Sequence, residues 1–242
     1  MSSMTRFTIR PLYLQVRDML VERIMSGQWK PGAAIANEVE LSRELGVSVG
    51  TIRKALDVME QERLITRRQG RGTYVNDHTS DTLATRFNRL RSDEGDCLAT
   101  STLTSEIKSG RPTEEEASKL DLPAGETVIR IRRIQVSDQQ QRVMLEHVAL
   151  PASRFPGLSS KKDVPQRIVA LAQQYGVLLG GANEKVSVIK ATADVAQALA
   201  VEDGTPLLTM DRVVTAIDGA PVEWRFAQCH LADGAYYSVD MD

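Results

Sequence analysis

Residues 35–75 read IANEVELSRELGVSVGTIRKALDVMEQERLITRRQGRGTYV, and this stretch decides the fold of the N-terminal part of the chain. It predicts two short helices joined by a tight turn. Asn37 can cap the first helix with Glu40 as its reciprocal partner, and Gly46 suits the left-handed conformation in which many helices end. Ser48 can cap the second helix, whose apolar residues recur at helical spacing. Together these features form a helix-turn-helix.

Two strand-like runs follow the second helix, and a glycine-rich tip with three arginines separates them. Gly70 and Gly72 permit a tight reversal of the chain. Arg67, Arg68 and Arg71 supply positive charge that can meet DNA phosphates or enter a minor groove, with a solvated tip as the alternative interpretation. This pattern is typical of a wing, so residues 1–76 are predicted to be a winged helix-turn-helix domain that binds double-stranded DNA.

The exposed face of the second helix completes the predicted DNA-binding surface. Arg53 can reach a guanine edge or a phosphate, and its alternative is a solvated helix arginine. Ser48 and Thr51 lie at the helix start, where hydroxyl and amide groups bind phosphate. Capping by Ser48 is equally compatible with the sequence. The predicted DNA-binding residues are Ser48, Val49, Gly50, Thr51, Arg53, Lys54, Arg67, Arg68, Gly70, Arg71 and Gly72.

Composition indicates an ordinary globular protein, with 242 residues, 42% hydrophobic and 26% charged, which is enough for two modest domains. No apolar run approaches the roughly 20 residues of a membrane helix, and the N-terminus lacks the apolar core of a signal peptide, so a cytoplasmic protein is expected. The first 76 residues carry 12 Lys and Arg against 8 Asp and Glu, whereas the rest of the chain is acidic. A basic head suits local contact with phosphate.

Sequence motifs give no support to an enzyme. The 2 cysteines and 3 histidines are far apart, and no zinc site, disulfide framework or other metal site is predicted. A P-loop, a GxSxG motif and a dinucleotide-binding glycine motif are all absent from the sequence. We therefore predict no catalytic residues and no cofactor.

Residues 77–94 begin with a polar stretch and are predicted to be a linker, and residues 95–242 form a second domain of α+β class. Alternation and β-branched residues predict a mostly antiparallel sheet with helices. The predicted strands are residues 98–108, 128–136, 142–149, 186–192, 207–216 and 222–230, with 235–239 closing the sheet. The predicted helices outside the helix-turn-helix are residues 11–26, 113–120, 163–175 and 195–199.

The head resembles the GntR family of transcription regulators over roughly its first 75 residues. The motifs that carry this resemblance are Pro11-Leu12-Tyr13, Gly27-Gln28-Trp29, Pro31-Gly32, Glu40-Leu41-Ser42, Leu45-Gly46-Val47-Ser48, Thr51-Ile52-Arg53, Ala55-Leu56, Leu64-Ile65 and GRGTYV. Many members of the family carry arginine at the position of Val49, and several also at Val39. Valine cannot donate a hydrogen bond to guanine but can touch a thymine methyl group, so we expect fewer guanine-directed contacts here. Arg63 stands where the family usually has glycine.

Residues 95–240 resemble the UTRA effector-binding domain of the HutC subfamily, through LPAGETVIRIRRI, EHVALP and GTPLLTMDRVV. The resemblance implies a sheet similar to that of chorismate lyase and a bound small anionic or polar metabolite. Arg133 aligns with an arginine that grips anionic effectors, and the second arginine of that pair is Gln135 here. The effector-binding residues implied by the resemblance are Arg133, Gln135, Glu146, Glu223, His230 and Tyr236. Structural charge pairs at the sheet surface are the alternative.

The sequence therefore predicts a ligand-responsive transcription regulator, with repression relieved by ligand as the family default. Its resemblance implies a homodimer that binds a palindromic operator, with two recognition helices about one DNA turn apart. An enzyme of chorismate-lyase-like fold that acts on a small carboxylate is the alternative.

Overall fold

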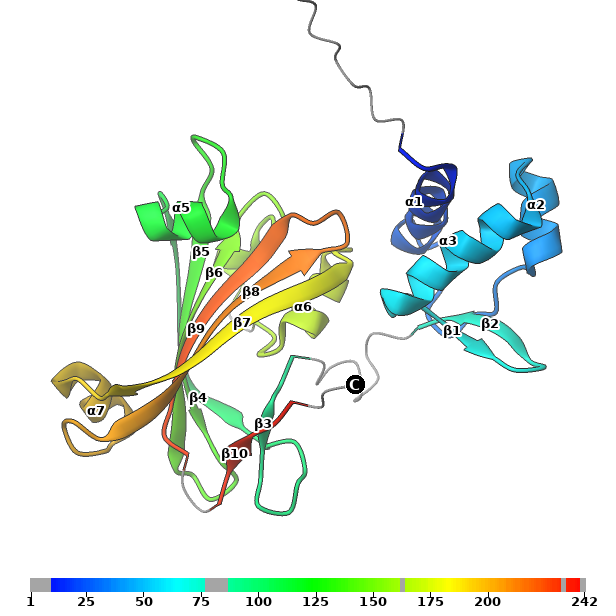
Figure 1. The fold of residues 1–242 in the computed structure, drawn as a ribbon. Helices are drawn as coiled ribbons and strands as arrows, with labels where there is room; N and C mark the ends of the chain where they lie inside the picture. The colour runs from blue at the N-terminus through cyan, green and yellow to red at the C-terminus, as the bar shows by residue number, and fades with distance from the viewer. Residues whose placement is uncertain (1–9, 77–86, 162–163, 232–233, 240–242) are drawn as a thin grey trace, which may run out of the picture. The chain divides into compact units, whose positions relative to one another are not determined.

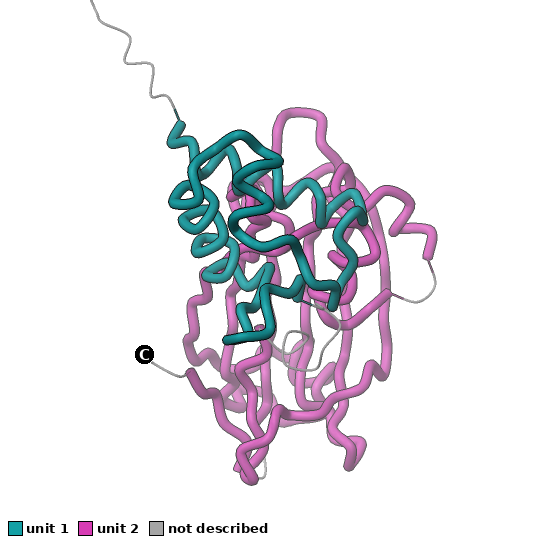
Figure 2. Tube along the Cα trace, turned by 90° about the vertical axis from the view of Figure 1, so that its right-hand side faces the viewer, with its two compact units in different colours: residues 1–78 teal, residues 79–242 magenta. Residues whose placement is uncertain are grey.

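The computed structural model describes residues 10–76, 87–161, 164–231 and 234–239. The chain divides into two compact units, residues 1–78 and residues 79–242, which Figure 2 colours separately. Among the described helices, none is long and apolar enough to cross a bilayer. Each unit is treated by itself below.

Three helices form the first unit, α1 (Leu12–Met25), α2 (Glu38–Leu45) and α3 (Val49–Gln61). The predicted capping box is confirmed, since the Asn37 side chain accepts hydrogen bonds from two helix amides and the Glu40 carboxylate accepts one from the Asn37 amide. Gly46 ends α2 with φ of 66°, and Ser48 caps α3. Local side-chain chemistry therefore sets the turn of the helix-turn-helix.

The wing is an antiparallel hairpin of β1 (Ile65–Arg68) and β2 (Gly72–Val75). A bridge between Ala34 and Tyr74 ties the loop before α2 to the wing. Apolar residues from all these elements are buried together, and they include Leu20, Leu41, Ile52, Leu56, Met59, Leu64 and Ile65. The first unit thus has its own core.

The second unit is built on a six-stranded antiparallel sheet (Figure 1). Its strands are β4 (Ser101–Gly110), β5 (Val128–Val136), β6 (Arg142–Pro151), β7 (Leu179–Lys190), β8 (Pro206–Ala216) and β9 (Pro221–Cys229). Their order across the sheet is β4-β5-β6-β9-β8-β7. The predicted α+β class with a mostly antiparallel sheet is confirmed.

Helices and a small second sheet cover the large sheet. The helix α6 (Ile168–Gln174) and the short η1 (Leu158–Ser160) contribute to the largest core cluster, against residues of β5, β6 and β8. The helices α5 (Glu114–Leu120) and α7 (Ala193–Leu199) pack their apolar residues into two further clusters. The strands β3 (Leu90–Arg91) and β10 (Tyr236–Tyr237) pair with each other and contribute to a fourth cluster.

The structure differs from the prediction most at three elements, while the strand predicted over residues 98–108 runs from Ser101 to Gly110. Residues 236–237 pair with β3 rather than closing the large sheet, and the linker predicted over 77–94 therefore contains strand residues and the buried Leu90. The helix predicted over 163–175 begins only at Ile168, because Pro165 disfavours a preceding helical turn and arginine side chains occupy the nearby carbonyls. The strand predicted over 186–192 extends back to Leu179.

Candidate DNA-binding surface and effector pocket

The start of α3 presents polar groups at the surface of the first unit. Ser48 Oγ accepts a hydrogen bond from the Thr51 amide at 3.1 Å and lies 2.8 Å from Thr51 Oγ1. Gly50 is exposed in the first turn, and Val49 beside it is half-buried. Because the first amides of a helix lack helical partners, this end of α3 can bind a phosphate oxygen.

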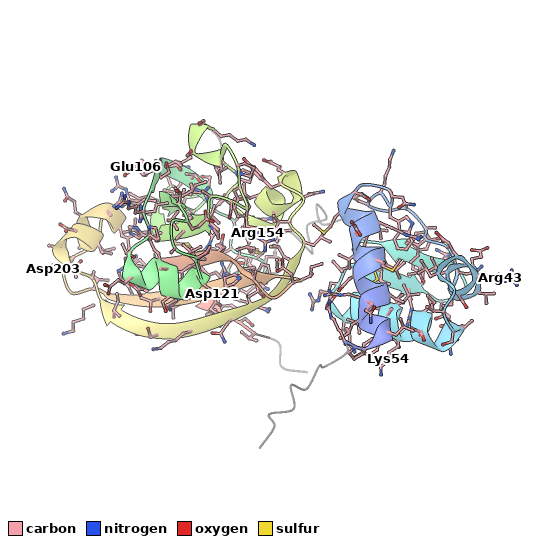
Figure 3. All side chains as sticks on the ribbon, turned by 90° about the horizontal axis from the view of Figure 1, so that it is seen from above. Arg43, Lys54, Glu106, Asp121, Arg154 and Asp203 are labelled. Atoms are coloured by element: carbon pink, nitrogen blue, oxygen red, sulfur yellow. The ribbon has the colours of Figure 1, made fainter. Side chains whose placement is uncertain are left out.

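Arg53 and Lys54 on α3 make different contacts within the head. The Arg53 side chain is 61% exposed, and its guanidinium pairs with the Glu38 carboxylate at 2.8 Å. This hydrogen bond raises the pKa of Arg53, so the side chain remains a cation. The ammonium of Lys54 lies 4.4 Å from the centre of the Tyr13 ring on α1, and Figure 3 shows Lys54 at the surface of the head. Both side chains are exposed cations on α3, and DNA would compete with Glu38 for Arg53.

The wing arginines fall into two groups. Arg67 is held by the head itself, because its guanidinium pairs with Asp57 and its amide donates to Glu60 at 3.0 Å. Arg68 lies over the Tyr74 ring at 4.9 Å and is exposed.

Arg71 sits at the exposed tip between Gly70 and Gly72, which have φ of 69° and 105°. Its side chain has no hydrogen bond or ion pair among the described residues. Arg71 and Arg68 thus extend the cationic surface of α3, while Arg67 orients the wing.

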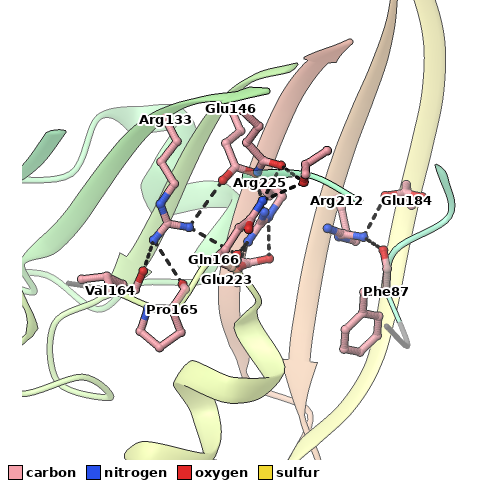
Figure 4. Close-up of polar contacts among 12 residues, drawn as sticks. Phe87, Arg133, Glu146, Val164, Pro165, Gln166, Glu184, Arg212, Glu223 and Arg225 are labelled. Carbon is pink, nitrogen blue, oxygen red and sulfur yellow. Dashed lines mark hydrogen bonds and ion pairs between the residues drawn. The ribbon is translucent and has the colours of Figure 1, made fainter. Parts of the chain in front are cut away.

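A buried charge cluster lies at the middle of the large sheet (Figure 4). Arg133 on β5 faces Glu146 on β6 in the strand register, and these charged groups lie 3.4 Å apart. Arg225 on β9 pairs with both Glu146 and Glu223, at 3.0 Å for the Glu223 contact. Period-two alternation places these side chains on one face of the sheet. The sequence analysis missed Arg225, although it follows Glu223 by two residues and so shares its face.

These charges are already satisfied within the protein. Arg133 donates to the carbonyls of Val164, Pro165 and Gln166 at 3.1–3.3 Å besides pairing with Glu146. Burial lowers the pKa of Arg133, whereas the carboxylates of Glu146 and Glu223 outweigh burial and raise the pKa of Arg225. Removing one member would leave a buried charge uncompensated, so the cluster has a structural role in this state of the protein.

A small cavity of about 70 Å³ adjoins this cluster. It lies between the start of α6, the strand β3 and the large sheet. Its polar wall includes Thr100, Gln135, Gln166, Arg167, Arg212 and Arg225, and its apolar wall includes Phe87, Leu90, Met144, Ile168 and Met210. Guanidinium and amide groups that converge on an apolar pocket suit a small anionic or polar ligand.

Arg212 on β8 is a buried charged residue in this wall, and the sequence analysis did not predict it. It is 8% exposed, donates to the Phe87 carbonyl and lies 3.4 Å from Glu184. Its Nε atom is buried without a hydrogen-bond partner among the described residues, and burial lowers its pKa. Buried donors are normally satisfied, so the unpaired Nε marks Arg212 as a candidate for contact with a ligand.

The predicted effector residues separate in space. Arg133, Glu146 and Glu223 lie in the buried cluster, and Gln135 lies beside them, where its side-chain carbonyl accepts from Gln166 at 2.5 Å and from Thr100 at 2.7 Å. His230 lines a different cavity, together with Asp138 and Leu231.

Tyr236 is 43% exposed on β10, also outside the wall of the small cavity. The structure therefore brings four of the six residues together and leaves His230 and Tyr236 apart.

Two family models match the chain. The model "Bacterial regulatory proteins, gntR family" matches residues 12–75, and the UTRA domain model matches residues 98–233. The two matches cover the helix-turn-helix with its wing and all six strands of the large sheet.

Curated relatives are transcription regulators. The chain is 26% identical over 215 residues to Rv0792c from Mycobacterium tuberculosis, covering 88% of this chain and 80% of that protein. It is 28% identical over 208 residues to the histidine utilization repressor of Pseudomonas putida, covering 84% and 81%. SmoD from Agrobacterium fabrum is 32% identical over 130 residues, and that match spans only about half of each chain, 51% and 53%.

Solved structures agree with these relatives. The ligand-binding domain of a GntR-family regulator from Bordetella bronchiseptica has a TM-score of 0.58 at 31% identity, over 65% of this chain and 98% of that one. YydK from Bacillus subtilis has a TM-score of 0.55 over 94% of this chain and 99% of its own, and at 19% identity it shows the fold alone. The relatives are regulators, which leaves the enzyme interpretation without support. The chain belongs to the gntR family of bacterial regulatory proteins, as a ligand-responsive, DNA-binding transcription regulator of the HutC type with a UTRA domain.

Proposed function

We propose that this regulator is a repressor that binds a palindromic operator as a homodimer and leaves it when a small anionic or polar metabolite binds the UTRA domain. Relatives named as repressors support the direction of regulation, including the mannosyl-D-glycerate system repressor MngR of Escherichia coli, 23% identical over 218 residues, 89% of this chain and 90% of that protein. The basic wing and the open N-terminus of α3 support contact with duplex DNA.

The effector site is proposed at the cavity beside Arg212. The observation that carries this assignment is Arg212, which lines the cavity with Gln166 and Arg167 and has a buried Nε without a hydrogen-bond partner in the described chain. A carboxylate or a single phosphate oxygen would satisfy this donor. Gln135 adds a polar group but no charge, which favours a monoanionic or partly polar ligand over a doubly charged one.

The DNA arm of the proposal is tested by salt dependence. Each phosphate that a basic side chain neutralises contributes about −0.9 to the slope of log K against log salt on duplex DNA. A regulator that uses both α3 and the wing should show a steep negative slope on its operator. A flat salt dependence would contradict the DNA-binding role.

The effector arm is tested by a thermal-shift screen of the full chain. The panel contains phosphorylated sugars, urocanate, small carboxylates, sulfate and inorganic phosphate. Ligand at a hundredfold excess over its Kd stabilises the folded state by about 2.7 kcal/mol. A hit that Arg212→Gln abolishes and Arg154→Gln preserves would support the assignment, because Arg154 pairs with Asp218 at the surface and lines no part of the cavity. A hit that survives Arg212→Gln would place the ligand elsewhere.

A further inference from the structure

Glu38, the first residue of α2, lies between the helix α3 and the wing. Its carboxylate accepts hydrogen bonds from Nε of Arg53 at 3.0 Å and from Nη2 of Arg53 at 2.8 Å. The same carboxylate lies 3.9 Å from the guanidinium of Arg67 on β1. One acidic side chain therefore pairs with arginines of both elements that are proposed to contact DNA.

The contacts of Arg67 join β1 to α3 beside this carboxylate. Nη2 of Arg67 donates a hydrogen bond to the Arg53 carbonyl at 3.2 Å, and its Nη1 pairs with Asp57. The backbone amide of Arg67 donates to the Glu60 carboxylate at 3.0 Å. Because these contacts hold the wing against α3, the position of Glu38 relative to Arg53 is set by three elements of the head.

The Arg53 guanidinium is held along one side. A guanidinium has five N–H donors, and Glu38 accepts from the Nε and Nη2 side of the group. Among the described residues, Nη1 of Arg53 has no hydrogen-bond partner. The outer end of the guanidinium therefore keeps free donors on both Nη atoms. A bidentate contact with O6 and N7 of guanine requires two such donors.

The direction of this guanidinium matters because α3 has few groups that can read a base. Arg53 is the only arginine in the sequence of α3, and Val49 at its start cannot donate a hydrogen bond. The neighbouring cation, Lys54, is a point charge that lies over the Tyr13 ring. Arg53 is therefore the group on α3 best suited to a bidentate contact with guanine.

We propose that Glu38 is a specificity-determining residue, which directs the Arg53 guanidinium toward a base edge and disfavours its use on a phosphate. This inference rests on the proposed contact between Arg53 and the operator. A phosphate would compete with the Glu38 carboxylate for the same donors, and the two negative charges repel each other. Specificity is a difference between two affinities, so a group that weakens binding to the wrong DNA raises it.

Glu38→Gln in the full chain tests this role, because glutamine keeps the shape of the side chain and removes its charge. Fluorescence anisotropy compares an operator duplex, selected from a randomised library with the wild-type protein, with a shuffled duplex of the same composition. On the shuffled duplex the released Arg53 should gain a phosphate contact. The slope of log K against log salt should then steepen by about 0.9.

The affinity of Glu38→Gln for the shuffled duplex should rise by about two- to fivefold, which corresponds to the contribution of an exposed ion pair. The affinity for the operator should rise less, because Arg53 already contacts a base there. The ratio of operator affinity to shuffled-duplex affinity should therefore fall.

Glu44→Gln is the matched control, since Glu44 lies on the same helix and pairs with Arg23 on α1 at 2.7 Å. This substitution removes the same charge from the head and should leave the affinity ratio unchanged. In an Arg53→Gln background, Glu38→Gln should no longer steepen the salt slope, an outcome that a purely structural role of Glu38 does not predict. Circular dichroism confirms that each variant is folded.

Three results would overturn the proposal: an unchanged affinity ratio for Glu38→Gln, an equal fall for Glu44→Gln, or an operator affinity that Arg53→Gln does not alter. In each of these cases, operator binding by the wild-type protein would leave the proposed function standing. If the wild-type protein selects no duplex from the library, the proposed function fails and this inference fails with it.

Discussion

Arg63 adopts the left-handed conformation, with φ of 58°, directly after α3. The amide of Leu64 donates to the Met59 carbonyl at 2.9 Å, which is the hydrogen bond of a Schellman-type helix end. Glycine occupies such positions at least cost, whereas an L-residue is strained there by about 1–2 kcal/mol. Replacing Arg63 by glycine would relieve this strain, but glycine also has more conformational freedom in the unfolded chain, which offsets part of the gain in stability. Arg63→Gly should therefore raise the free energy of unfolding by about 0.5–1 kcal/mol.

Urea unfolding followed by circular dichroism measures this change. Arg43→Gly is the matched control, because Arg43 lies inside the regular helix α2 and the same substitution should destabilise it by about 1 kcal/mol. Equal effects of the two substitutions would show that the conformation of Arg63 carries no strain.

We propose that Val49 and Val39 belong to the surface of the head that reads DNA. Val39 is 47% exposed, and Val49 stands at the N-terminus of α3. Val49→Arg adds a bidentate donor and should raise affinity for half-sites that contain guanine, by about 1–3 kcal/mol per good guanine contact. Selection from a randomised operator library with wild type and variant measures the shift in preference. An unchanged consensus would mean that this position does not read the bases.

At the scale of residues, the helix ends could be predicted from the sequence, because they depend on residues close in the chain. Asn37, Gly46 and Ser48 adopt the predicted roles because a helix end is satisfied by side chains within a few residues. Arg225 and Arg212 were missed for the opposite reason. Glu146 of β6 meets Arg225 of β9, and Glu184 of β7 meets Arg212 of β8, only through the pairing of these strands in the sheet.

At the scale of elements, strong periodic segments were placed correctly and weaker ones were not. The strand β5 begins and ends as predicted because its sequence is rich in Ile and Val, which favour strands. In contrast, α6 starts five residues later than predicted, because the carbonyls of residues 164–166 accept from Arg133 and Arg225 instead of from helix amides. Apolar periodicity cannot report such tertiary hydrogen bonds.

The wing arginines lead to a prediction at this scale, because Arg71 is exposed and Arg67 is held in ion pairs within the head. Arg71→Ala should reduce the magnitude of the salt slope by about 0.9, since its exposed side chain is available to a phosphate. Arg67→Ala should change the slope less, since its guanidinium is held by Asp57 and Glu60. Fluorescence anisotropy on the operator across a salt series measures both slopes. A larger change for Arg67 than for Arg71 would contradict this division.

At the scale of the whole molecule, residues 77–86 join the two units along the chain, so we propose that a signal from the UTRA domain reaches the head through its covalent connection to this segment. Phe87 is the first described residue after that segment, and its carbonyl accepts a hydrogen bond from Arg212 in the cavity wall. A ligand anion at Arg212 would compete with the Phe87 carbonyl for the same guanidinium. Ligand binding in the cavity can therefore alter the contact of Phe87, the residue at which the described UTRA domain begins.

This arrangement predicts that Arg212→Gln impairs release from the operator by ligand without impairing operator binding. Arg212→Gln should leave operator affinity without ligand within about twofold of wild type, because the substitution lies outside the head. The ligand found by thermal shift should then release the variant from the operator at least about tenfold less effectively, because a charge-assisted hydrogen bond contributes about 1.5–3 kcal/mol. Anisotropy titrations with Arg154→Gln as control measure both quantities. Full ligand-induced release of Arg212→Gln would show that the signal reaches the head without passing through Arg212 and Phe87.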